Sequence, residues 1–464
     1  MHSYDEDLTQ QVMDHLLHRL RLDPPPLGRT GDREELRLAL KDGIGPGPRD
    51  PRDVLRTFAE SVEPTVLSCD HPAFLAFIPG APTKAAALFD MALSASSLHG
   101  VSWLEASGAV AAENQVLALL AELAGLPDGA GGCFVSGGSL GNLSALVVAR
   151  DTGRRRLGLP EHAPVRIAVS DQVHSSVGNT LRILGVEPLV VATADHRLTG
   201  DELRAALDAA DADGGAPVVA AVATAGTTNA GIVDELEAVA ELTRARGLWL
   251  HVDAAYGGAA LFVPAERDRL RGIEHADSVV MDPHKWLFAP FDCGALLYRD
   301  PALARAVHTQ DASYLDAIHG AASATPGGQG AVEAEEDWNP SDYAYHLTRR
   351  PRGLPLWFSL SVHGTDAYRD AVARGFEVAR YTARRTERTD GLELLREPEL
   401  SVVLVRRTGW GPEEYYAWSR QLLAEGTAFV TPTVWEGETV ARLAFLHPGI
   451  TEETVDAILT SMTA

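Results

Sequence analysis

The stretch Ser278-Val279-Val280-Met281-Asp282-Pro283-His284-Lys285-Trp286-Leu287-Phe288 joins a short apolar run to a turn that carries a lysine. The apolar part is one of a series of such runs, and this composition is typical of strands that are covered on both faces. The other runs lie at 165–169, 189–191, 218–222 and 248–252. Helical patterns alternate with them, at 109–123, 142–150, 201–210 and 234–246. The alternation predicts an α/β fold with a mostly parallel sheet and helices on both faces.

The remainder of the chain divides around this region. Residues 1–65 contain an amphipathic helix at 7–21 that ends before a run of three prolines, and they are too few for a core of their own. We expect this segment to pack on a partner subunit. Residues 66–350 are expected to form a large domain, in which the Ala/Gly/Ser-rich and then acidic stretch 311–345 is a mobile loop. From 351 to 464, helical patterns and β-like runs predict a smaller α+β domain, with the β-like runs at 400–405, 427–430 and 440–445.

Composition limits the class of protein. The chain has 464 residues, 45% of them hydrophobic, and a formal net charge of −24, which argues against nonspecific nucleic-acid binding. No apolar run is long enough to span a bilayer, and the polar, acidic N-terminus lacks the features of a signal peptide. Cys69, Cys133 and Cys293 have the spacing of neither a disulfide framework nor a zinc site. We therefore expect a cytoplasmic globular protein that binds no metal.

Lys285 is one of only three lysines, with Lys41 and Lys84, so arginine supplies nearly all the positive charge. A lysine amine can lose its proton and form a Schiff base with a carbonyl, whereas a guanidinium cannot. The alternative is a lysine whose stem packs beside an aromatic strand. Lys285 and Asp253 both follow predicted strands, at the edge where such sheets bind ligands.

Three other turns carry candidate binding residues. The glycine-rich run 131–142 leads into a helix whose N-terminal N–H groups can attract an anion, although a plain strand–helix turn is equally compatible. His174 follows a strand, where an imidazole can stack on a planar ring, transfer protons or have a structural role only. The hydroxyls of the turn 225–231 can bind a ligand or cap the next helix.

Asp253 is followed by Ala254 and Ala255, which leave room for a flat group. Its carboxylate can hold a cation such as a protonated pyridine nitrogen, or it can cap a helix. An anion cradle, a stacking imidazole, a carboxylate and a Schiff-base lysine together match the phosphate, ring, ring nitrogen and aldehyde of pyridoxal 5'-phosphate.

The order of these residues resembles that of the group II pyridoxal-phosphate decarboxylases, the family of aromatic-L-amino-acid, histidine and glutamate decarboxylases. The resemblance runs from about residue 55 to the C-terminus. Its most specific motif is Asp282-Pro283-His284-Lys285-Trp286-Leu287, followed by Phe291-Asp292-Cys293-Gly294. The resemblance implies fold type I, the fold of aspartate aminotransferase, with a seven-stranded, mostly parallel sheet and a smaller C-terminal α+β domain. It also implies a homodimer with sites at the subunit interface.

The resemblance implies a role for each matching residue. Lys285 forms the Schiff base, Asp253 pairs with the pyridinium nitrogen, and a protonated ring is the better electron sink. Ala255 packs against one face of the ring and His174 stacks on the other. The remaining matches are phosphate contacts at Gly138, Ser139 and His284, and a contact to the ring hydroxyl and substrate carboxylate at Thr228.

The resemblance also implies a substrate pocket. Its wall would consist of Phe77, Ile78 and Pro79, with His99 and Val101 from the partner subunit. Because this wall is mostly apolar, it favours an aromatic or bulky apolar amino acid over glutamate. Gly364 matches a position where relatives that act on indole substrates tend to have glycine, which tilts the prediction toward tryptophan-like substrates.

The chain departs from the family in the loop. Decarboxylases carry a loop tyrosine that protonates the carbanion, and relatives with phenylalanine there make aldehydes by oxidative deamination. The expected position falls near Pro340, so Tyr343 takes the role only if the loop register slips. The main prediction is therefore decarboxylation of an L-amino acid to the amine and carbon dioxide. The alternatives are an aldehyde synthase, an aminotransferase or other fold type I enzyme, and a non-catalytic cofactor-binding protein.

Overall fold

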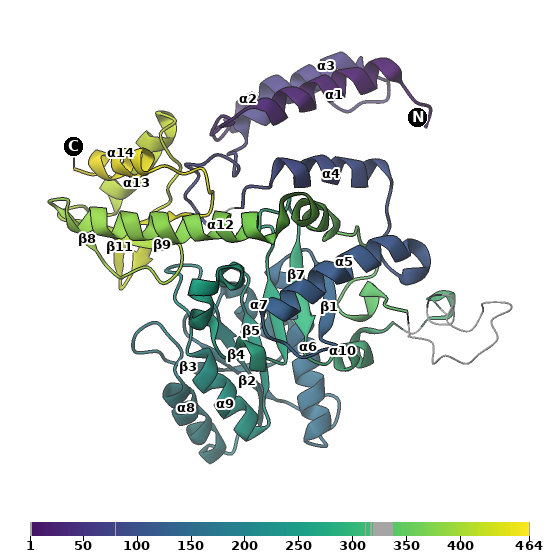
Figure 1. The fold of residues 1–464 in the computed structure, drawn as a ribbon, viewed down its shortest axis with the longest axis vertical. Helices are drawn as coiled ribbons and strands as arrows, with labels where there is room; N and C mark the ends of the chain where they lie inside the picture. Colours follow the sequence, from purple (N-terminus) through teal and green to yellow (C-terminus); the bar gives the residue numbers. More distant parts are fainter. Residues whose placement is uncertain (1, 79, 311, 316–317, 319–336, 464) are drawn as a thin grey trace.

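A central sheet of seven strands organises the computed structural model, which describes residues 2–463 except 79, 311, 316–317 and 319–336 (Figure 1). The strands are, in spatial order, β1 (Gly131–Val135), β7 (Gly294–Tyr298), β6 (Ser278–Met281), β5 (Trp249–Asp253), β4 (Val218–Thr224), β2 (Arg166–Ser170) and β3 (Glu187–Val191). β7 is antiparallel to both of its neighbours, and the other neighbouring strands are parallel. The predicted mostly parallel sheet is confirmed.

Successive strand residues face opposite sides of the sheet and enter two separate hydrophobic layers. On one side, Phe134 and Ala221 pack with α5 (Trp103–Leu123), α8 (Gly200–Ala212) and α9 (Leu236–Arg246). On the other side, Cys133 and Ala220 pack with α6 (Gly138–Arg156), α7 (Ser175–Leu184) and α10 (Pro301–His308). The strands are buried on both faces, which explains their nearly continuous apolar sequence.

The sequence pattern located five of the seven strands and missed β1 and β7. Of the helices that cover the sheet, it missed α7 and α10. β1 begins with Gly131 and Gly132, and glycine is depleted in strands, so the pattern indicated only a turn. The β-like run at 427–430 is not a strand of the small sheet. Instead, Phe429 forms an isolated bridge with Phe74, beside the main-chain hydrogen bond from Leu75 N to Phe429 O.

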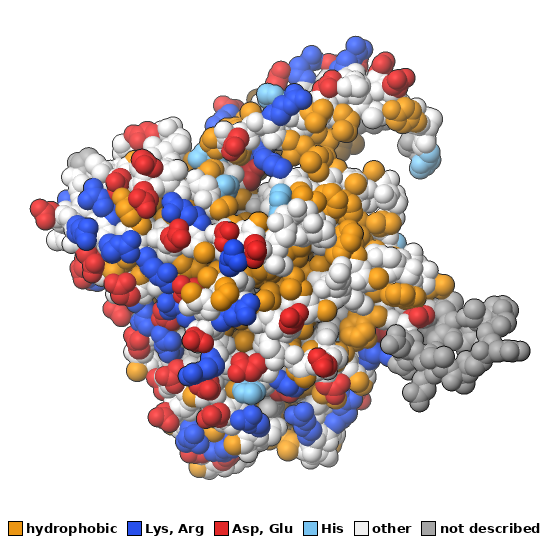
Figure 2. Space-filling view, viewed as in Figure 1, with side chains coloured by type: hydrophobic (Ala, Val, Ile, Leu, Met, Phe, Trp, Pro, Cys, Tyr) orange, Lys and Arg blue, Asp and Glu red, His pale blue; other side chains and the backbone are white. Residues whose placement is uncertain are grey.

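The N-terminal helices lie apart from the sheet, alongside α4 (Lys84–Ala95) (Figure 1). They are α1 (Glu6–Arg21), α2 (Arg33–Ala39) and α3 (Pro51–Thr57), and none of them has a buried residue. The ion pair between Arg19 and Asp70, at 2.9 Å, helps to attach α1 to the body. Figure 2 shows hydrophobic side chains gathered between these helices and α4. That residues 1–65 pack on a partner subunit stays a prediction.

A second, antiparallel sheet forms the smaller C-terminal part. Its strands are β10 (Thr433–Trp435), β11 (Glu438–Ala444), β9 (Val402–Arg407) and β8 (Leu392–Leu394). Its helices are α12 (Leu354–Glu387), α13 (Pro412–Ala424) and α14 (Glu452–Ser461). α12 contacts α4 and α5 of the large domain as well as β8 and β9, so the predicted division at residue 351 remains a proposal.

Most of the predicted mobile loop at 311–345 lies outside the described residues. The described part of its C-terminal end includes a short 3-10 helix at Pro340–Asp342. No helix in the described part of the chain has the length and apolar character needed to cross a membrane.

Candidate active site

A cavity of about 350 Å³ lies at the carboxyl-terminal edge of the central sheet. β4 and β5 end in Thr224 and Asp253, and Ser136 and Asp282 directly follow β1 and β6, so four strand ends meet there. The structure brings together the following candidates from the sequence: Gly138, Ser139, His174, Thr228, Asp253, Ala255, His284 and Lys285. The remaining lining residues are Gly137, Leu140, Asn142, Ser176, Gly226 and Tyr256.

The glycine-rich turn after β1 forms one wall of the cavity. Gly137 precedes α6 at a φ of 146°, which favours glycine, and no side chain caps the helix. The first N–H groups of a helix have no partner within the helix, so those of Gly138 and Ser139 are available to an anion. A Cβ on Gly138 would lie 3.0 Å from Asp282 Oδ2 and 3.1 Å from Ala255 Cβ, so this site needs a residue without a side chain.

The lysine turn follows β6. Lys285 Nζ lies 3.0 Å from Asp282 Oδ2, and Asp282 is buried. His284 Nδ1 accepts a hydrogen bond from Cys293 N at 3.1 Å, and burial lowers the pKa of His284. A Cβ on Gly80 would lie only 2.0 Å from His284 O, which means that the chain leaving Ile78 packs directly on the lysine turn.

Asp253 lies on the cavity floor and is fixed by two hydrogen bonds. Its Oδ2 accepts from Asn142 Nδ2 at 2.9 Å, and its Oδ1 accepts from Ala255 N at 3.1 Å. Asn142 Oδ1 in turn lies 2.8 Å from Nε2 of the buried His251. Burial lowers the pKa of His251 to about 4, so this imidazole is neutral.

His174 is the N-cap of α7. Its Nδ1 lies 2.8 Å from Ser176 Oγ and accepts the Ser176 backbone N–H at 3.3 Å. Ser176 Oγ also accepts from Asn142 Nδ2 at 3.0 Å. His174 and Asp253 are therefore joined through one asparagine, although they come from different elements.

Thr228 lies on the loop that follows β4, and the buried Arg442 of β11 holds this loop. The Arg442 guanidinium donates to Thr228 O, to Phe77 O at 2.7 Å and to Asn229 O at 3.0 Å. Arg442 is 5% exposed, and burial lowers its pKa to about 10. It ties two predicted site segments together across 214 and 365 residues of sequence.

Asp234 lies at the end of the same loop and binds the backbone where the loop begins. Its carboxylate accepts the backbone N–H groups of Thr224 at 2.7 Å and of Leu198 at 2.8 Å. Burial raises the pKa of Asp234 to about 7.

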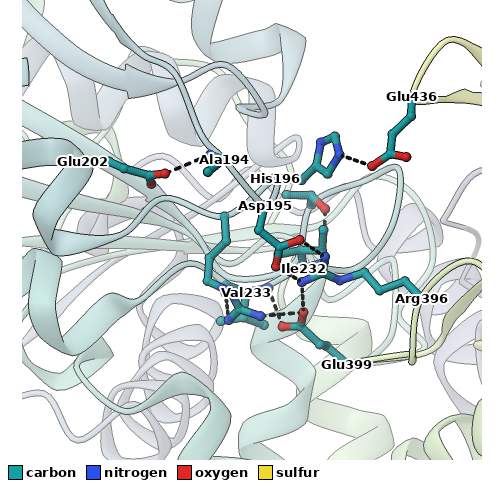
Figure 3. Close-up of polar contacts among 11 residues, drawn as sticks. Ala194, Asp195, His196, Glu202, Ile232, Val233, Arg396, Glu399 and Glu436 are labelled. Atoms are coloured by element: carbon teal, nitrogen blue, oxygen red, sulfur yellow. Dashed lines mark hydrogen bonds and ion pairs between the residues drawn. The ribbon is translucent and has the colours of Figure 1, made fainter.

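Ion pairs connect the segment that follows β3 to Arg396 and Glu399 of the C-terminal part, and Glu399 also bonds the loop after β4 (Figure 3). Glu399 accepts from Arg197 at 2.7 Å and from the Val233 N–H at 3.1 Å. Arg396 pairs with Asp195 at 2.7 Å, on the segment that follows β3. The position of Thr228 therefore depends on contacts with both domains.

The predicted substrate-pocket residues do not line this cavity. Phe77 is 60% exposed and Ile78 is buried, while Pro79 lies outside the described residues. His99 Nδ1 pairs with Glu105 Oε1 at 3.0 Å, and Val101 O accepts from Ser341 N at 3.3 Å. The roles of these residues in substrate binding stay predictions.

Gly364 and Tyr343 also lie away from the cavity lining. Gly364 forms a kink in α12, at a φ of 76°. Tyr343 is 2% exposed and stacks on Trp338 with ring centroids 4.3 Å apart, within the hydrophobic layer of α6 and α10. That Tyr343 protonates a carbanion stays a prediction.

Comparison with known proteins gives the family. The pyridoxal-dependent decarboxylase conserved domain matches residues 46–407. The chain belongs to the pyridoxal-dependent decarboxylase family. Its members named below are amino-acid decarboxylases, which are lyases.

Similar proteins cover nearly the whole chain. The aromatic-L-amino-acid decarboxylase of Bacillus atrophaeus is 29% identical over 98% of this chain and 92% of the relative. The L-2,4-diaminobutyrate decarboxylase of Rhizobium meliloti (strain 1021) is 33% identical over 90% of this chain and 83% of the relative. The crystal structure of Oryza sativa TDC with PLP and tryptamine superimposes with a TM-score of 0.88 and 26% identity, covering 100% of this chain and 99% of that chain.

The residues of this decarboxylase fit pyridoxal phosphate, the cofactor of the family. At Gly137 and Gly138 a Cβ would crowd His284 and Asp282, and the uncapped N–H groups at the start of α6 suit a phosphate. Asp253 places a carboxylate, and Lys285 an amine, on the same cavity. The buried Thr224 Oγ1 has no hydrogen-bond partner among the described residues, as expected of a lining group that a ligand completes.

No group of three or more His, Cys, Asp and Glu residues in the described part of the chain could hold a metal ion. The sequence analysis did not identify Asn142, Ser176, His251 or Asp282 as site residues. Arg442 was missed too, although a lone arginine in the apolar run Val440-Ala441-Arg442-Leu443-Ala444 was a usable signal.

Proposed function

We propose that this decarboxylase removes carbon dioxide from an L-amino acid, with aromatic amino acids favoured, and releases the corresponding amine. The convergence of the α6 N-terminus, Asp253, His174 and Lys285 on one cavity supports this proposal most directly. Each has the chemistry needed for one part of pyridoxal phosphate.

In the proposed arrangement, Lys285 attaches the cofactor through its amine, and Gly138 and Ser139 bind the phosphate through main-chain N–H groups. Asp253 holds a proton on the ring nitrogen by charge. Ala255 and His174 enclose the two faces of the ring. When bound, pyridoxal phosphate supplies an electron sink for the bond that breaks.

The protein selects the reaction by positioning the substrate. His174 and Thr228 lie at the same cavity and would orient a substrate carboxylate there. Asp282 is 3.0 Å from Lys285 Nζ and would hold the lysine side chain in place at the cavity. Both contributions are electrostatic and depend on the preorganised groups around the cavity.

The substrate class rests on the apolar residues near the cavity. Arg442 donates to both Phe77 O and Thr228 O, so Phe77 lies near the lining residue Thr228, and Phe77 is largely exposed. Lys285 is the only lysine or arginine among the described lining residues, and it is assigned to the cofactor. An acidic substrate side chain would therefore lack a cationic partner there.

A product assay tests the proposal. The protein is incubated in air with pyridoxal phosphate and, separately, tryptophan, tyrosine, phenylalanine, histidine, glutamate and 2,4-diaminobutyrate, and products are identified by mass spectrometry. Amine and carbon dioxide from an aromatic amino acid are expected. Amine from diaminobutyrate or glutamate alone would refute the substrate class, and no amine from any of them would refute the activity.

Lys285 is tested by borohydride reduction followed by peptide mass mapping. A reduced adduct of cofactor mass is expected on the peptide that contains Lys285. Lys285→Arg keeps a cation beside Asp282 but has no reactive amine, and it should give no adduct. An adduct on Lys41 or Lys84 would refute the assignment.

A second candidate is oxygen-dependent formation of an aldehyde. It is favoured by Pro340, which stands near the expected position of the loop tyrosine, and by the buried position of Tyr343. Its products in the same assay would be aldehyde, ammonia and hydrogen peroxide.

A homodimer is proposed as the functional unit, because a shared site would bring His99 and Val101 of one subunit to the cavity of the other. The exposed apolar side chains Leu8, Met13 and Leu17 on α1 and Leu88 on α4 support an interface there. Sedimentation of the purified protein as a monomer would refute it.

A further inference from the structure

A chain of hydrogen bonds beneath the cavity connects Asp253 and His174, and the inference drawn from it rests on the proposed function. We propose that Asn142 is a positioning residue that couples these two side chains. We further infer that the chain gives neutral His174 its proton on Nε2, so that the nitrogen opposite Ser176 is a hydrogen-bond donor.

Trp249 lies at one end of the hydrogen-bonded chain. An indole N–H can only donate, and Trp249 Nε1 donates to Ser278 Oγ at 2.9 Å. The Ser278 hydroxyl then has its own proton for His251 Nδ1, which lies 2.8 Å away. The Ser278 oxygen can also accept a second hydrogen bond, so the acceptor-only carboxylate of Asp253, at the other end of the chain, decides that His251 Nδ1 accepts.

His251 lies between Ser278 and Asn142 and contacts both of them. The imidazole is fully buried and neutral, so its one N–H must be on Nε2 when Nδ1 accepts. Nε2 lies 2.8 Å from Asn142 Oδ1, which identifies that atom as the amide oxygen. Asn142 Nδ2 is thereby free to donate to Asp253 Oδ2 at 2.9 Å and to Ser176 Oγ at 3.0 Å.

Asp253 decides this assignment. An ionised carboxylate can only accept, so the Asn142 atom that faces Asp253 must be the NH₂ group. The acceptor-only carboxylate fixes the orientation of Asn142, and the donor-only indole at the other end is compatible with it. An amide turned by 180° would place oxygen against oxygen at 2.9 Å.

The second hydrogen on Asn142 Nδ2 is donated to Ser176, which in turn contacts His174. Ser176 Oγ accepts from Asn142, so its hydroxyl proton is available to His174 Nδ1 at 2.8 Å. The Ser176 backbone N–H points at the same nitrogen, at 3.3 Å. Two donors directed at Nδ1 leave Nε2 as the protonated nitrogen of the neutral ring. Since His174 lines the cavity, a fixed donor there suits a carboxylate or another oxygen of the substrate, and not a cation.

Nitrogen-15 NMR of histidine-labelled protein tests the tautomer, with and without pyridoxal phosphate. The His174 signals are identified by their loss in His174→Gln. We expect Nε2 to be protonated and Nδ1 to be unprotonated in the wild-type protein. Protonation of Nδ1 in the neutral ring would overturn the inferred hydrogen-bond direction.

The positioning role of Asn142 is tested by Asn142→Ala, with Asn179→Ala on the exposed face of α7 as the matched control. Loss of one charge-assisted hydrogen bond to Asp253 should weaken cofactor binding by about tenfold or more and shift the pH dependence of the bound cofactor's absorption. His251→Gln keeps an N–H toward Asn142 and should preserve both properties better than His251→Leu.

Unchanged affinity and an unchanged absorption profile in Asn142→Ala would overturn the positioning role. Equal effects of His251→Gln and His251→Leu would overturn the relay through His251. If the wild-type protein gave no cofactor absorption, the proposed function would fail, whereas the His174 tautomer of the cofactor-free protein would still decide the hydrogen-bond direction.

Discussion

Gly138→Ala tests whether the N-terminus of α6 binds an anion. The new Cβ would lie 3.0 Å from Asp282 Oδ2 and 3.1 Å from Ala255 Cβ. Both neighbours are buried side chains on short connections after strands, and neither can swing away like the end of a long side chain. The backbone of Gly138 must therefore move by a few tenths of an ångström, together with its N–H.

The expected magnitude follows from the hydrogen bonds at stake. A hydrogen bond to a charged group contributes roughly 1.5–3 kcal/mol. Displacing one main-chain donor from a phosphate should therefore weaken binding of pyridoxal phosphate by roughly 10- to 100-fold, at about 1.4 kcal/mol for each factor of ten. Because a shift of a few tenths of an ångström beside the cavity costs little packing, the stability of the cofactor-free protein should change by much less.

Equilibrium titration with pyridoxal phosphate, followed by absorption, gives the affinity, and urea denaturation gives the stability. Gly178→Ala is the matched control, because it makes the same change within α7 and its Cβ would meet nothing within 4 Å. An unchanged affinity in Gly138→Ala would show that the phosphate is not held at this helix. Equal losses in both variants would attribute the effect to helix propensity instead.

Three further variants are informative. Ionising Asp234 in the folded protein is unfavourable because burial raises its pKa from 3.8 to about 7, so the free energy of unfolding should fall by up to about 4 kcal/mol as the pH rises from about 4 to 7. Asp234→Asn should remove this slope in urea denaturation, and an unchanged slope would contradict the assignment. Arg442→Met should lower the free energy of unfolding by about 3 kcal/mol, since three carbonyls lose their donor; an equally stable variant would exclude this tie between the loops. Tyr343→Phe should reduce amine formation in favour of aldehyde, and the proton-donor role is wrong if the amine yield is unchanged.

The fold was readable from the sequence where burial leaves a continuous apolar run. β2, β4, β5 and β6 have such runs because helices cover both of their faces. β1 escaped recognition because Gly131 and Gly132 have no apolar side chain. Gly132 is nevertheless required, since a Cβ there would lie 1.9 Å from Leu296 O in β7. The reason for glycine is a contact with a strand that follows more than 150 residues later.

Some residues of the candidate site could likewise be recognised from the sequence, and others could not. Lys285, Asp253 and His174 were recognisable because a specific residue type stands within five residues after a predicted strand. Asn142 was not, because its importance comes from hydrogen bonds to residues 109 and 111 positions away. His251 occupies an alternating position within a strand, where the pattern indicates only a buried side chain.

The antiparallel strand β7 has a consequence for how the site can vary. It lies between β1 and β6, so the glycine-rich turn and the lysine turn follow strands two positions apart in the sheet, at about 4.8 Å for each position. The sheet thus fixes the spacing between the turn proposed to bind the phosphate and the turn proposed to bind the aldehyde. Insertions in loops outside the sheet do not change the spacing between β1 and β6. Loops around the cavity can therefore differ in sequence while the distance between the two turns stays constant.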